Sequence, residues 1–361
     1  MKKLLCVLLS VVFLCSCGET LGDAEEIFSS SDGETLSYAV FYDGESLATL
    51  NVKDEKYYIK TRSENGEEKT VYTLADGNYA YELYAGDGTI AFFERSLYTN
   101  RDERCTLKVI NTKTNDVYTP FSKVIVYDNY DVQSRFIEID GNDVYYITSS
   151  LTLGETRIMK YTQGEDEPVE FTTLSLTEND LSFGHSITSF GIDNGKLICA
   201  CLDGYSNVLQ IFDLKSGVCE KKKLLPSNVG VVYSVFYSQE NDTAAMYYSE
   251  VDKEGKVSAE HIGTVTGKDE NITVLYTLEE NEKVNRETVH FDGEYVCFNI
   301  SDSDDISYKN FKGIIINSKN QKSVSLDGCM LSFTKDGILY NISIDKNDEK
   351  NILFIKAGVD I

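Results

Sequence analysis

Short apolar runs alternate with turn-forming residues along most of the chain. A first run ends at Asp-Gly, Asn-Gly or Asn-Asp, and a second run rich in Tyr, Ile, Val and Phe follows. Such a dipeptide between two apolar runs is a strong hairpin signal, because Asp, Asn and Gly tolerate the positive φ of a primed turn. The pattern therefore predicts a series of antiparallel hairpins. Their turns lie at Asp87-Gly88, Asp140-Gly141, Asn194-Gly195, Asn241-Asp242, Asp292-Gly293 and Asp336-Gly337.

The hairpins recur at a regular distance. Their second turn residues are separated by 53, 54, 47, 51 and 44 positions. A third strand is predicted after each hairpin, for example at 107–111 and 209–213, and a fourth after most, for example at 168–172 and 271–276. Four antiparallel strands at a period near 50 are typical of a β-propeller blade. One blade cannot bury both faces of its sheet, so we expect the units to pack face to face.

Two regions bear on the number of blades. The stretch before the first hairpin holds four more apolar segments, at 36–42, 47–52, 56–60 and 70–74, whereas the last unit ends near Lys356 after three strands. The four segments either form a complete seventh blade, or the first of them pairs with the outer edge of the last unit. We expect an all-β propeller over 36–361 with seven four-stranded antiparallel blades. Six blades, or an antiparallel β-sandwich, meander or solenoid, are the alternatives.

The repeat resembles known propellers only in outline. Its length and strand pattern over residues 78–358 are similar to those of divergent bacterial propellers of the TolB-like or quinoprotein-like kind. The repeats carry no Trp-Asp signature, and the chain has no Trp. The resemblance implies an architecture and no particular activity.

The N-terminus predicts export. Lys2 and Lys3 precede an apolar run from Leu4 to Leu14, which is typical of a secretory signal. A membrane-spanning helix needs about 20 apolar residues, so this run is too short to be one. The closing Leu14-Cys15-Ser16-Cys17 resembles the lipobox of bacterial lipoproteins.

That resemblance implies cleavage before Cys17 and lipidation of its thiol, with ordinary signal-peptide cleavage as the alternative. We expect a signal peptide at 1–16, a flexible tether at 17–35 that is rich in Gly, Ser, Glu and Asp, and a protein attached to the cell membrane outside the cytoplasm.

The charge balance narrows the classes of partner. The chain has 59 acidic and 34 basic residues and a net charge of -25, which becomes -27 once Lys2 and Lys3 are removed. Such a surface repels phosphate backbones and anionic headgroups, so we expect no nucleic-acid binding and no broad electrostatic adhesion to membranes. Membrane attachment must then come from the lipid on Cys17. The excess charge also favours a soluble monomer.

No motif indicates catalysis. The histidines at 185, 261 and 290 form no His-Glu-x-x-His pair, and no glycine-rich phosphate loop or nucleophile elbow is present. Cys199-Ala-Cys201 places two sulfurs on one face of a strand, but no second pair completes a zinc site. We assign no catalytic residue, no metal and no cofactor. Six cysteines remain after cleavage, and their pairing cannot be derived from sequence; Cys199 and Cys297 fit small buried thiols best.

A binding site is expected on the longer connections. The links between second and third strands, predicted at 94–106, 148–156, 249–260 and 301–312, and those between successive units emerge on one face of an up-and-down blade. Exposed Tyr and Arg are favoured at interfaces. The candidate contact residues are Tyr98, Arg101, Arg104, Tyr127, Tyr130, His185, Tyr205 and Tyr308.

These features together predict a binding or protein-interaction module at the cell envelope. Its partner would be an envelope protein, a peptide or a glycan. The alternative is a propeller hydrolase that acts on a glycan or peptide through carboxylates facing the channel.

Overall fold

A computed structural model describes most of the chain from residue 35 onward. The described residues are 35–43, 46–63, 65–97, 102–126, 137–150, 155–175, 186–203, 206–269, 271–301, 311–335, 338–344, 352–359 and 361. These residues are all-β and include no helix. Within them, no helix is therefore long and apolar enough to cross a membrane. The lipobox, Cys17 and the tether up to residue 34 lie outside the described residues.

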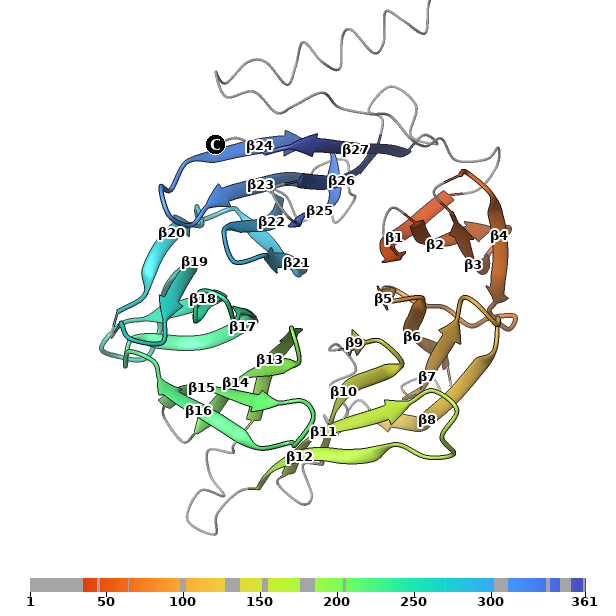
Figure 1. Ribbon diagram of the computed structural model, residues 1–361, viewed down its shortest axis with the longest axis horizontal. Helices are drawn as coiled ribbons and strands as arrows, with labels where there is room; N and C mark the ends of the chain where they lie inside the picture. Colours follow the sequence, from red (N-terminus) through yellow and green to blue (C-terminus); the bar gives the residue numbers. More distant parts are fainter. Residues whose placement is uncertain are drawn as a thin grey trace, which may run out of the picture. The chain divides into compact units, whose positions relative to one another are not determined.

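The chain divides into two compact units, and the first comprises Asp32–Ser227. It contains four antiparallel sheets, in each of which the strands pair in sequence order (Figure 1). Their strands are β1 (Thr35–Asp43), β2 (Ser46–Lys53), β3 (Lys56–Arg62) and β4 (Glu68–Thr73); β5 (Tyr84–Gly86), β6 (Thr89–Leu97), β7 (Asp102–Asn111) and β8 (Val117–Val126); β9 (Ile137–Asp140), β10 (Asp143–Ser150), β11 (Glu155–Thr162) and β12 (Val169–Ser175); and β13 (Ser186–Asp193), β14 (Lys196–Asp203), β15 (Ser206–Asp213) and β16 (Cys219–Leu224).

The second unit comprises Asn228–Ile361 and contains three sheets built in the same way. Two have four strands, and the last has three within the described residues. The strands are β17 (Val229–Ser238), β18 (Thr243–Val251), β19 (Val257–Thr266) and β20 (Thr273–Thr277); β21 (Lys283–Phe291), β22 (Tyr295–Ser301), β23 (Phe311–Asn317) and β24 (Ser323–Asp327); and β25 (Cys329–Lys335), β26 (Ile338–Ile344) and β27 (Ile352–Gly358).

The predicted pair of left-handed turn residues is confirmed at two of the five described turns; at Asp140-Gly141, Asn241-Asp242 and Asp292-Gly293 only the second residue has a positive φ. Asp87 and Gly88 have φ of 50° and 81°, and Asn194 and Gly195 have φ of 45° and 74°, which is the left-handed pair that a primed turn requires. Asp336-Gly337 lies outside the described residues. The four N-terminal segments are also confirmed as strands: they form a sheet of their own, in which β1 is an edge strand paired with β2.

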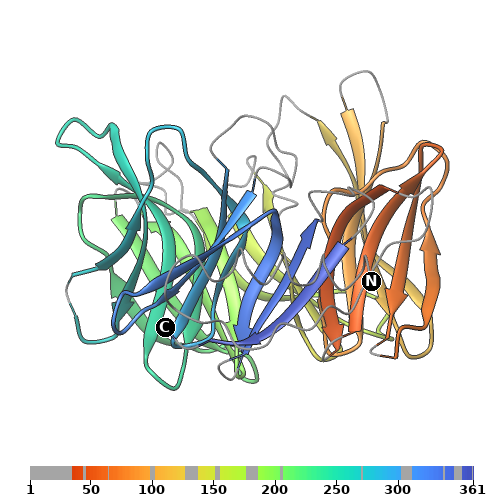
Figure 2. The ribbon, with the colours of Figure 1, turned by 90° about the horizontal axis from the view of Figure 1, so that it is seen from above.

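Burial differs systematically across each sheet. Strand β22 is buried at every residue, and β2, β6 and β15 are buried along most of their length. The last strands, such as β4 and β16, are mostly exposed. A strand covered on both faces reads as a continuous apolar run, which is why the second strands have the strongest sequence signal. Figure 2 shows the strands of one such sheet, β1–β4, lying side by side (red to orange).

A bulge recurs between the third and fourth strands. The register shifts at Ile59/Lys60, Leu107/Val109, Ile158/Met159, Ile211/Phe212 and Ile262/Gly263. A bulge increases the local right-handed twist. Its return at equivalent positions in five sheets shows that the sequence repeat is a structural repeat.

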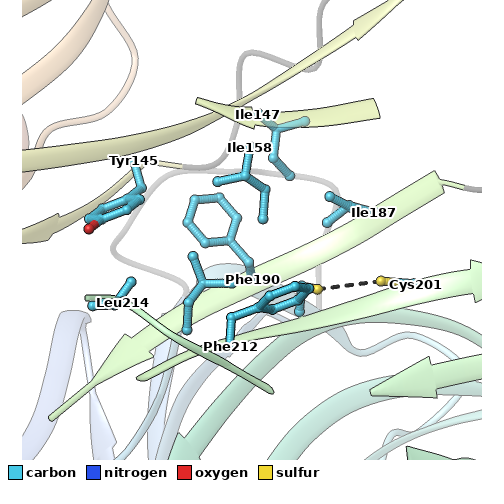
Figure 3. Packing of buried hydrophobic residues seen from close by; sticks show 10 residues of the cluster. Tyr145, Ile147, Ile158, Ile187, Phe190, Cys201, Phe212 and Leu214 are labelled. Carbon is cyan, nitrogen blue, oxygen red and sulfur yellow. Dashed lines mark hydrogen bonds between the residues drawn. The ribbon is translucent and has the colours of Figure 1, made fainter. Parts of the chain in front are cut away.

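Apolar clusters join consecutive sheets within each unit. In the first unit, Tyr145 and Ile147 of β10 pack against Phe190 of β13 and Phe212 of β15 (Figure 3). Apolar side chains of β5–β8 and β9–β12 form a second cluster. In the second unit, similar clusters join β17–β20 to β21–β24 and β21–β24 to the last sheet. This is the face-to-face packing expected of the repeat, because it removes both faces of an inner sheet from water.

Hydrogen bonds also join equivalent turns of neighbouring sheets. Gly141 N donates to Asp87 Oδ2 at 3.1 Å, and Thr89 Oγ1 donates to Gly141 O at 3.0 Å. In the second unit Asn241 Nδ2 donates to Gly293 O at 2.8 Å. The partners lie 52 or 54 residues apart, so the sequence period corresponds to direct contacts between repeats.

The predicted long links between second and third strands are corrected in three places. Strand β6 continues to Leu97 and β7 begins at Asp102, so the link spans 98–101 instead of 94–106. The links after β10 and β18 likewise shorten to 151–154 and 252–256. Polar side chains near the strand ends suggested loops, but main-chain pairing continues through them because it does not depend on side-chain polarity. The link between β22 and β23 spans 302–310, close to the predicted 301–312.

The six remaining cysteines are all thiols in the described structure. Cys199 and Cys297 are fully buried, as the sequence predicts. The Sγ atoms of Cys199 and Cys201 lie 3.4 Å apart. The hydrogen bond with Cys201 and burial raise the pKa of the Cys199 thiol well above its usual value, so Cys199 is a poor nucleophile.

Candidate recognition surface

Most of the predicted contact residues fall outside the described residues. This holds for Tyr98, Arg101, Tyr127, Tyr130, His185, Tyr205 and Tyr308. Arg104 is described: it lies on β7 opposite Ser96 of β6, with an exposed side chain. Of the predicted contact residues, the structure therefore describes only Arg104, at the β6–β7 hairpin.

A group of side chains that the sequence analysis did not name, two of them exposed and two half-buried, lies at this end of β6. It consists of Tyr79, Tyr81, Arg95 and Leu97, which we call the hairpin platform. Tyr81 is 60% exposed and Leu97 is 74% exposed, the largest exposed fraction among the large apolar residues described. Large apolar side chains held in water at the end of a strand favour a role in recognition over a role in stability.

The platform residues contact one another. The Tyr79 and Tyr81 rings meet edge to face with centroids 5.3 Å apart, and the Arg95 guanidinium carbon lies 5.6 Å from the Tyr81 centroid. Leu97 follows two residues after Arg95 on the same strand, so it lies on the same face. Tyr and Arg are the residues most enriched at energetically important positions of protein interfaces, because they join apolar area to polar tips.

The segment that carries the tyrosines, the link 74–83 between β4 and β5, is tied to β6 by its backbone. Tyr79 N donates to Arg95 O at 3.0 Å, and Arg95 N donates to Tyr79 O at 2.8 Å. Leu74, Ala80 and Leu83 of the link are buried. A connection with paired backbone and buried side chains presents its exposed residues in one conformation, which lowers the entropy lost on binding.

The buried carboxylate of Glu94 binds the first half of the link through hydrogen bonds. Glu94, 5% exposed, accepts hydrogen bonds from Tyr72 Oη at 2.7 Å, from Asn78 Nδ2 at 2.7 Å and from Ala75 N at 3.3 Å. Lys108 Nζ lies 3.8 Å from its Oε2. Burial, reinforced by the bond to Glu94, raises the pKa of Tyr72, so this phenol stays a donor at neutral pH. Glu94 thus joins the first sheet, the link and the second sheet.

Arg104 lies on the opposite face of the same hairpin. Directly paired residues share a face, so Arg104 lies on the face of Ser96, whereas Arg95 and Leu97 lie on the other. The predicted contact residue is therefore exposed beside the platform but is not part of it.

The sequence held one usable signal for the platform: Tyr79 and Tyr81 are two residues apart, as are Arg95 and Leu97. The contact between these pairs has no sequence signature.

The two described histidines lie in packed polar or aromatic surroundings. His261, 7% exposed, has Nε2 3.0 Å from Glu250 Oε2 and Nδ1 3.0 Å from Thr277 Oγ1. His290 is half-buried, with its ring edge-on to Phe236 at 5.7 Å and to Phe333 at 5.5 Å. The two aromatic contacts are typical of a histidine with a structural role.

The pair of Glu250 and His261 predicts a pH effect. The hydrogen bond from Asn228 Nδ2 is the main reason why the pKa of the Glu250 carboxyl lies below its usual value of 4.5. The hydrogen bond with His261 is the second cause. A carboxyl with a lowered folded-state pKa stabilises the fold above its unfolded pKa and loses that contribution as the pH falls. We expect the difference in unfolding free energy between wild type and Glu250→Gln to shrink as the pH falls below about 4.5. Urea unfolding at several pH values measures it.

The matched control for this pH effect is Glu254→Gln, which changes an exposed carboxylate in the neighbouring turn. It should show no comparable trend with pH. A wild-type advantage over Glu250→Gln that is the same at neutral and acid pH would contradict the assignment.

One carboxylate with a raised pKa bears on the hydrolase alternative. Burial is the main cause that raises the pKa of the Asp140 carboxyl, and the negative charges of Asp143 and Asp87 raise it further. Its two neighbours have structural partners: Asp143 Oδ2 lies 2.6 Å from Lys160 Nζ, and Asp87 accepts the Gly141 N–H. The three carboxylates stand at tight turns, where Asp is favoured for local reasons. This arrangement is typical of turn stabilisation.

Comparisons with known proteins support the fold class. No protein-family profile matches the sequence, and no curated protein matches it. Among solved structures, a prolyl endopeptidase is similar with a TM-score of 0.54 and 12% identity over 91% of this chain and 50% of that chain. A candidate dipeptidyl aminopeptidase IV from Bacteroides ovatus is similar with a TM-score of 0.51 and 12% identity over 90% of this chain and 56% of that one. The chain thus spans about half the length of these two proteins.

The β-propeller domain of the trilobed protease from Pyrococcus furiosus is also similar, with 13% identity over 78% of this chain and 82% of that chain and a TM-score of 0.49. The serial four-stranded antiparallel sheets and the two longer similarities place the chain in the β-propeller fold class. At these identities the likeness concerns the fold alone.

Proposed function

We propose that this protein is an exported, lipid-anchored β-propeller that binds another envelope protein or peptide through the hairpin platform. The seven sheets would be its blades, and Cys17 would carry the lipid. The observation that carries the proposal is the exposure of Tyr81, on a link fastened by paired backbone and by Glu94, together with the exposure of Leu97 at the end of β6. A rigid scaffold that holds aromatic, aliphatic and arginine side chains in water is suited to recognition.

The platform is tested by crosslinking in the native envelope. A photoreactive amino acid replaces Leu97 in the tagged full chain, and adducts are identified by mass spectrometry. We expect one dominant partner, and the change Tyr81→Ser should weaken its binding by about 2 kcal/mol, roughly 30-fold in affinity.

The control for the crosslinking experiment is Val257→Ser, which removes an apolar side chain of similar exposure, 58%, from the second unit. This change should leave the adduct unchanged. An adduct yield that does not depend on Tyr81, or the absence of any adduct, would contradict the proposed surface.

Three further measurements separate the remaining hypotheses. Incorporation of labelled palmitate that is lost in Cys17→Ala tests the lipid anchor by itself. Binding on a glycan array that is lost in Tyr81→Ser would replace a protein partner by a glycan. Hydrolysis of peptide or glycan substrates that is lost in Asp140→Asn would favour the enzyme alternative and overturn the binding-module proposal.

A further inference from the structure

An arginine of the second unit lies against an aromatic ring instead of a carboxylate. The guanidinium carbon of Arg286, on β21, lies 5.9 Å from the centroid of the Tyr233 ring on β17, and both side chains are half-buried. Within the described part of the chain, no carboxylate oxygen lies within 4.0 Å of this guanidinium. Removing a charge partly from water costs free energy that an ion pair normally offsets, and the chain has 59 acidic residues to supply one.

Two bulges on the first strands of neighbouring sheets place these side chains. After Asn285, five positions of β21 face only two of β22, so Arg286 lies in a wide bulge. At Tyr233, two positions of β17 face one of β18. Ser234 Oγ donates to Arg286 O at 2.8 Å and so ties the two bulges together, and Thr288 Oγ1 donates to Asn285 O at 2.7 Å within the second bulge. Bulges re-aim side chains and are common next to functional sites.

The groups around the guanidinium leave its charge in place. The Tyr233 and Tyr247 rings lie with centroids 4.7 Å apart, and Tyr247 Oη donates to Glu260 Oε2. Burial raises the pKa of both phenols, so they are neutral at physiological pH and supply no negative charge to Arg286. Glu260 is the acidic neighbour of the phenols, and no ion pair joins it to Arg286 among the described residues.

The chemistry of this arrangement fits a carboxylate ligand. Stacking on Tyr233 orients the guanidinium but engages none of its N–H donors. The planar fork of arginine matches the two oxygens of a carboxylate with two parallel hydrogen bonds. One guanidinium balances one negative charge, and the nearby Glu260 disfavours a second, so a monoanion fits better than a phosphate. Val231, 38% exposed, donates its N–H to Ser249 Oγ at 2.9 Å and adds apolar surface to the bulge of β17.

We propose that the bulges at Tyr233 and Arg286 form a binding site for a monoanionic organic carboxylate. The Arg286 guanidinium donates to both oxygens of the ligand, and Val231 contacts its apolar part. The site lies wholly within the second unit, so it depends neither on the hairpin platform nor on the lipid at Cys17. A free organic acid and the C-terminus of a peptide carry the same group, and the experiment distinguishes these two sources.

The test observes the Arg286 side chain directly by NMR. The chain from residue 18 onward is labelled with nitrogen-15 at arginine, and the Nε–H signal that is lost in Arg286→Lys is assigned to Arg286. Phenylacetate is titrated at constant ionic strength. We expect this signal to move to lower field and to saturate at millimolar ligand. The neutral analogue phenylacetamide should bind at least about tenfold more weakly, because it cannot form the charge-assisted pair of hydrogen bonds.

Matched variants make the test specific, with phenylacetate binding measured by equilibrium dialysis. Arg286→Gln should weaken binding at least about tenfold. Arg286→Lys keeps the charge but loses the planar fork, so it should also weaken binding. The control is Arg157→Gln, which removes a half-buried guanidinium whose Nη1 lies 3.6 Å from Glu170 in the first unit, and it should leave binding unchanged. Thermal melting shows whether each variant folds, and the comparison of phenylacetate with phenylacetamide on the wild type needs no variant.

Several outcomes would overturn the carboxylate site. These are the absence of a saturable shift at Arg286, equal binding of phenylacetate and phenylacetamide, and an equal loss of binding in Arg157→Gln. Tighter binding of inorganic phosphate than of phenylacetate would also overturn it, because the site would then select phosphate.

A peptide probe assigns the source of the carboxylate. Acetyl-glycyl-phenylalanine is compared in its free-acid and amidated forms. Binding that is tighter than that of phenylacetate and is lost on amidation supports a peptide C-terminus as the ligand. Binding of phenylacetate that is as tight as that of the free-acid peptide, or tighter, supports a free organic acid.

Discussion

Replacing Glu94 by leucine is expected to lower the free energy of unfolding by about 3 kcal/mol, because three hydrogen-bond donors lose their acceptor. The donors are Tyr72 Oη, Asn78 Nδ2 and Ala75 N, and Lys108 loses its nearby charge. Leucine also has a different shape from the carboxylate that it replaces. Urea unfolding measured by circular dichroism gives the loss directly.

Glu94 also connects stability to the proposed recognition surface. It is 5% exposed and lies beneath the link that presents Tyr81, so its loss should weaken partner binding without removing a contact residue. The graded control is Tyr72→Phe, which removes one donor of the three and should cost about 1 kcal/mol. Exposed Glu165→Gln should change neither stability nor binding. A Glu94→Leu protein as stable as wild type would contradict the assigned role.

Replacing Gly293 by alanine is expected to destabilise the protein by about 3 kcal/mol, through backbone strain and a steric clash together. Gly293 has φ of 99°, a conformation that alanine adopts poorly. An added Cβ would lie 2.6 Å from Ser238 Oγ and 3.0 Å from Asn241 Nδ2. The change also disturbs the bond from Asn241 to Gly293 O, which joins equivalent turns of two sheets.

Gly255→Ala separates the two contributions. Gly255 has φ of 78° and nothing within 4 Å of an added Cβ, so alanine there should cost only about 1 kcal/mol of conformational strain. Both glycines lie in the second unit, and thermal or urea unfolding of the two variants is directly comparable. Equal losses at the two positions would show that the close approach at Gly293 is unimportant.

Local signals account for the part of the fold that the sequence predicts well. The turn at Asp87-Gly88 is specified by which residues tolerate positive φ, a property of two residues that needs no distant partner. Strands such as β22 are buried throughout, so the residues Tyr295 to Phe298 form a continuous apolar run in the sequence. The strand ends are the part predicted least well. At Glu94, polar residues suggested a loop where pairing continues, because ladder hydrogen bonds are made by the backbone.

The surface that we propose for recognition lies at a hairpin that the sequence analysis named, but the sequence did not predict the residues of this surface. The sequence analysis expected contacts at the β6–β7 end and named Arg104, which is exposed there. It did not find Tyr81, because the exposure of a tyrosine in a link depends on what covers it. It did not find Glu94 either, since among 59 acidic residues nothing local distinguishes a buried carboxylate from a solvated one.

The sequence by itself determined the repeat, the hairpin turns and the all-β class, because period, apolar runs and turn residues act over a few neighbouring positions. It also predicts export and lipidation, which depend on a short N-terminal pattern. Only the tertiary structure decided that Glu94 holds the link 74–83 and that Tyr79 and Tyr81 meet Arg95. These features depend on contacts between strands, which are not set by the residues of one segment alone.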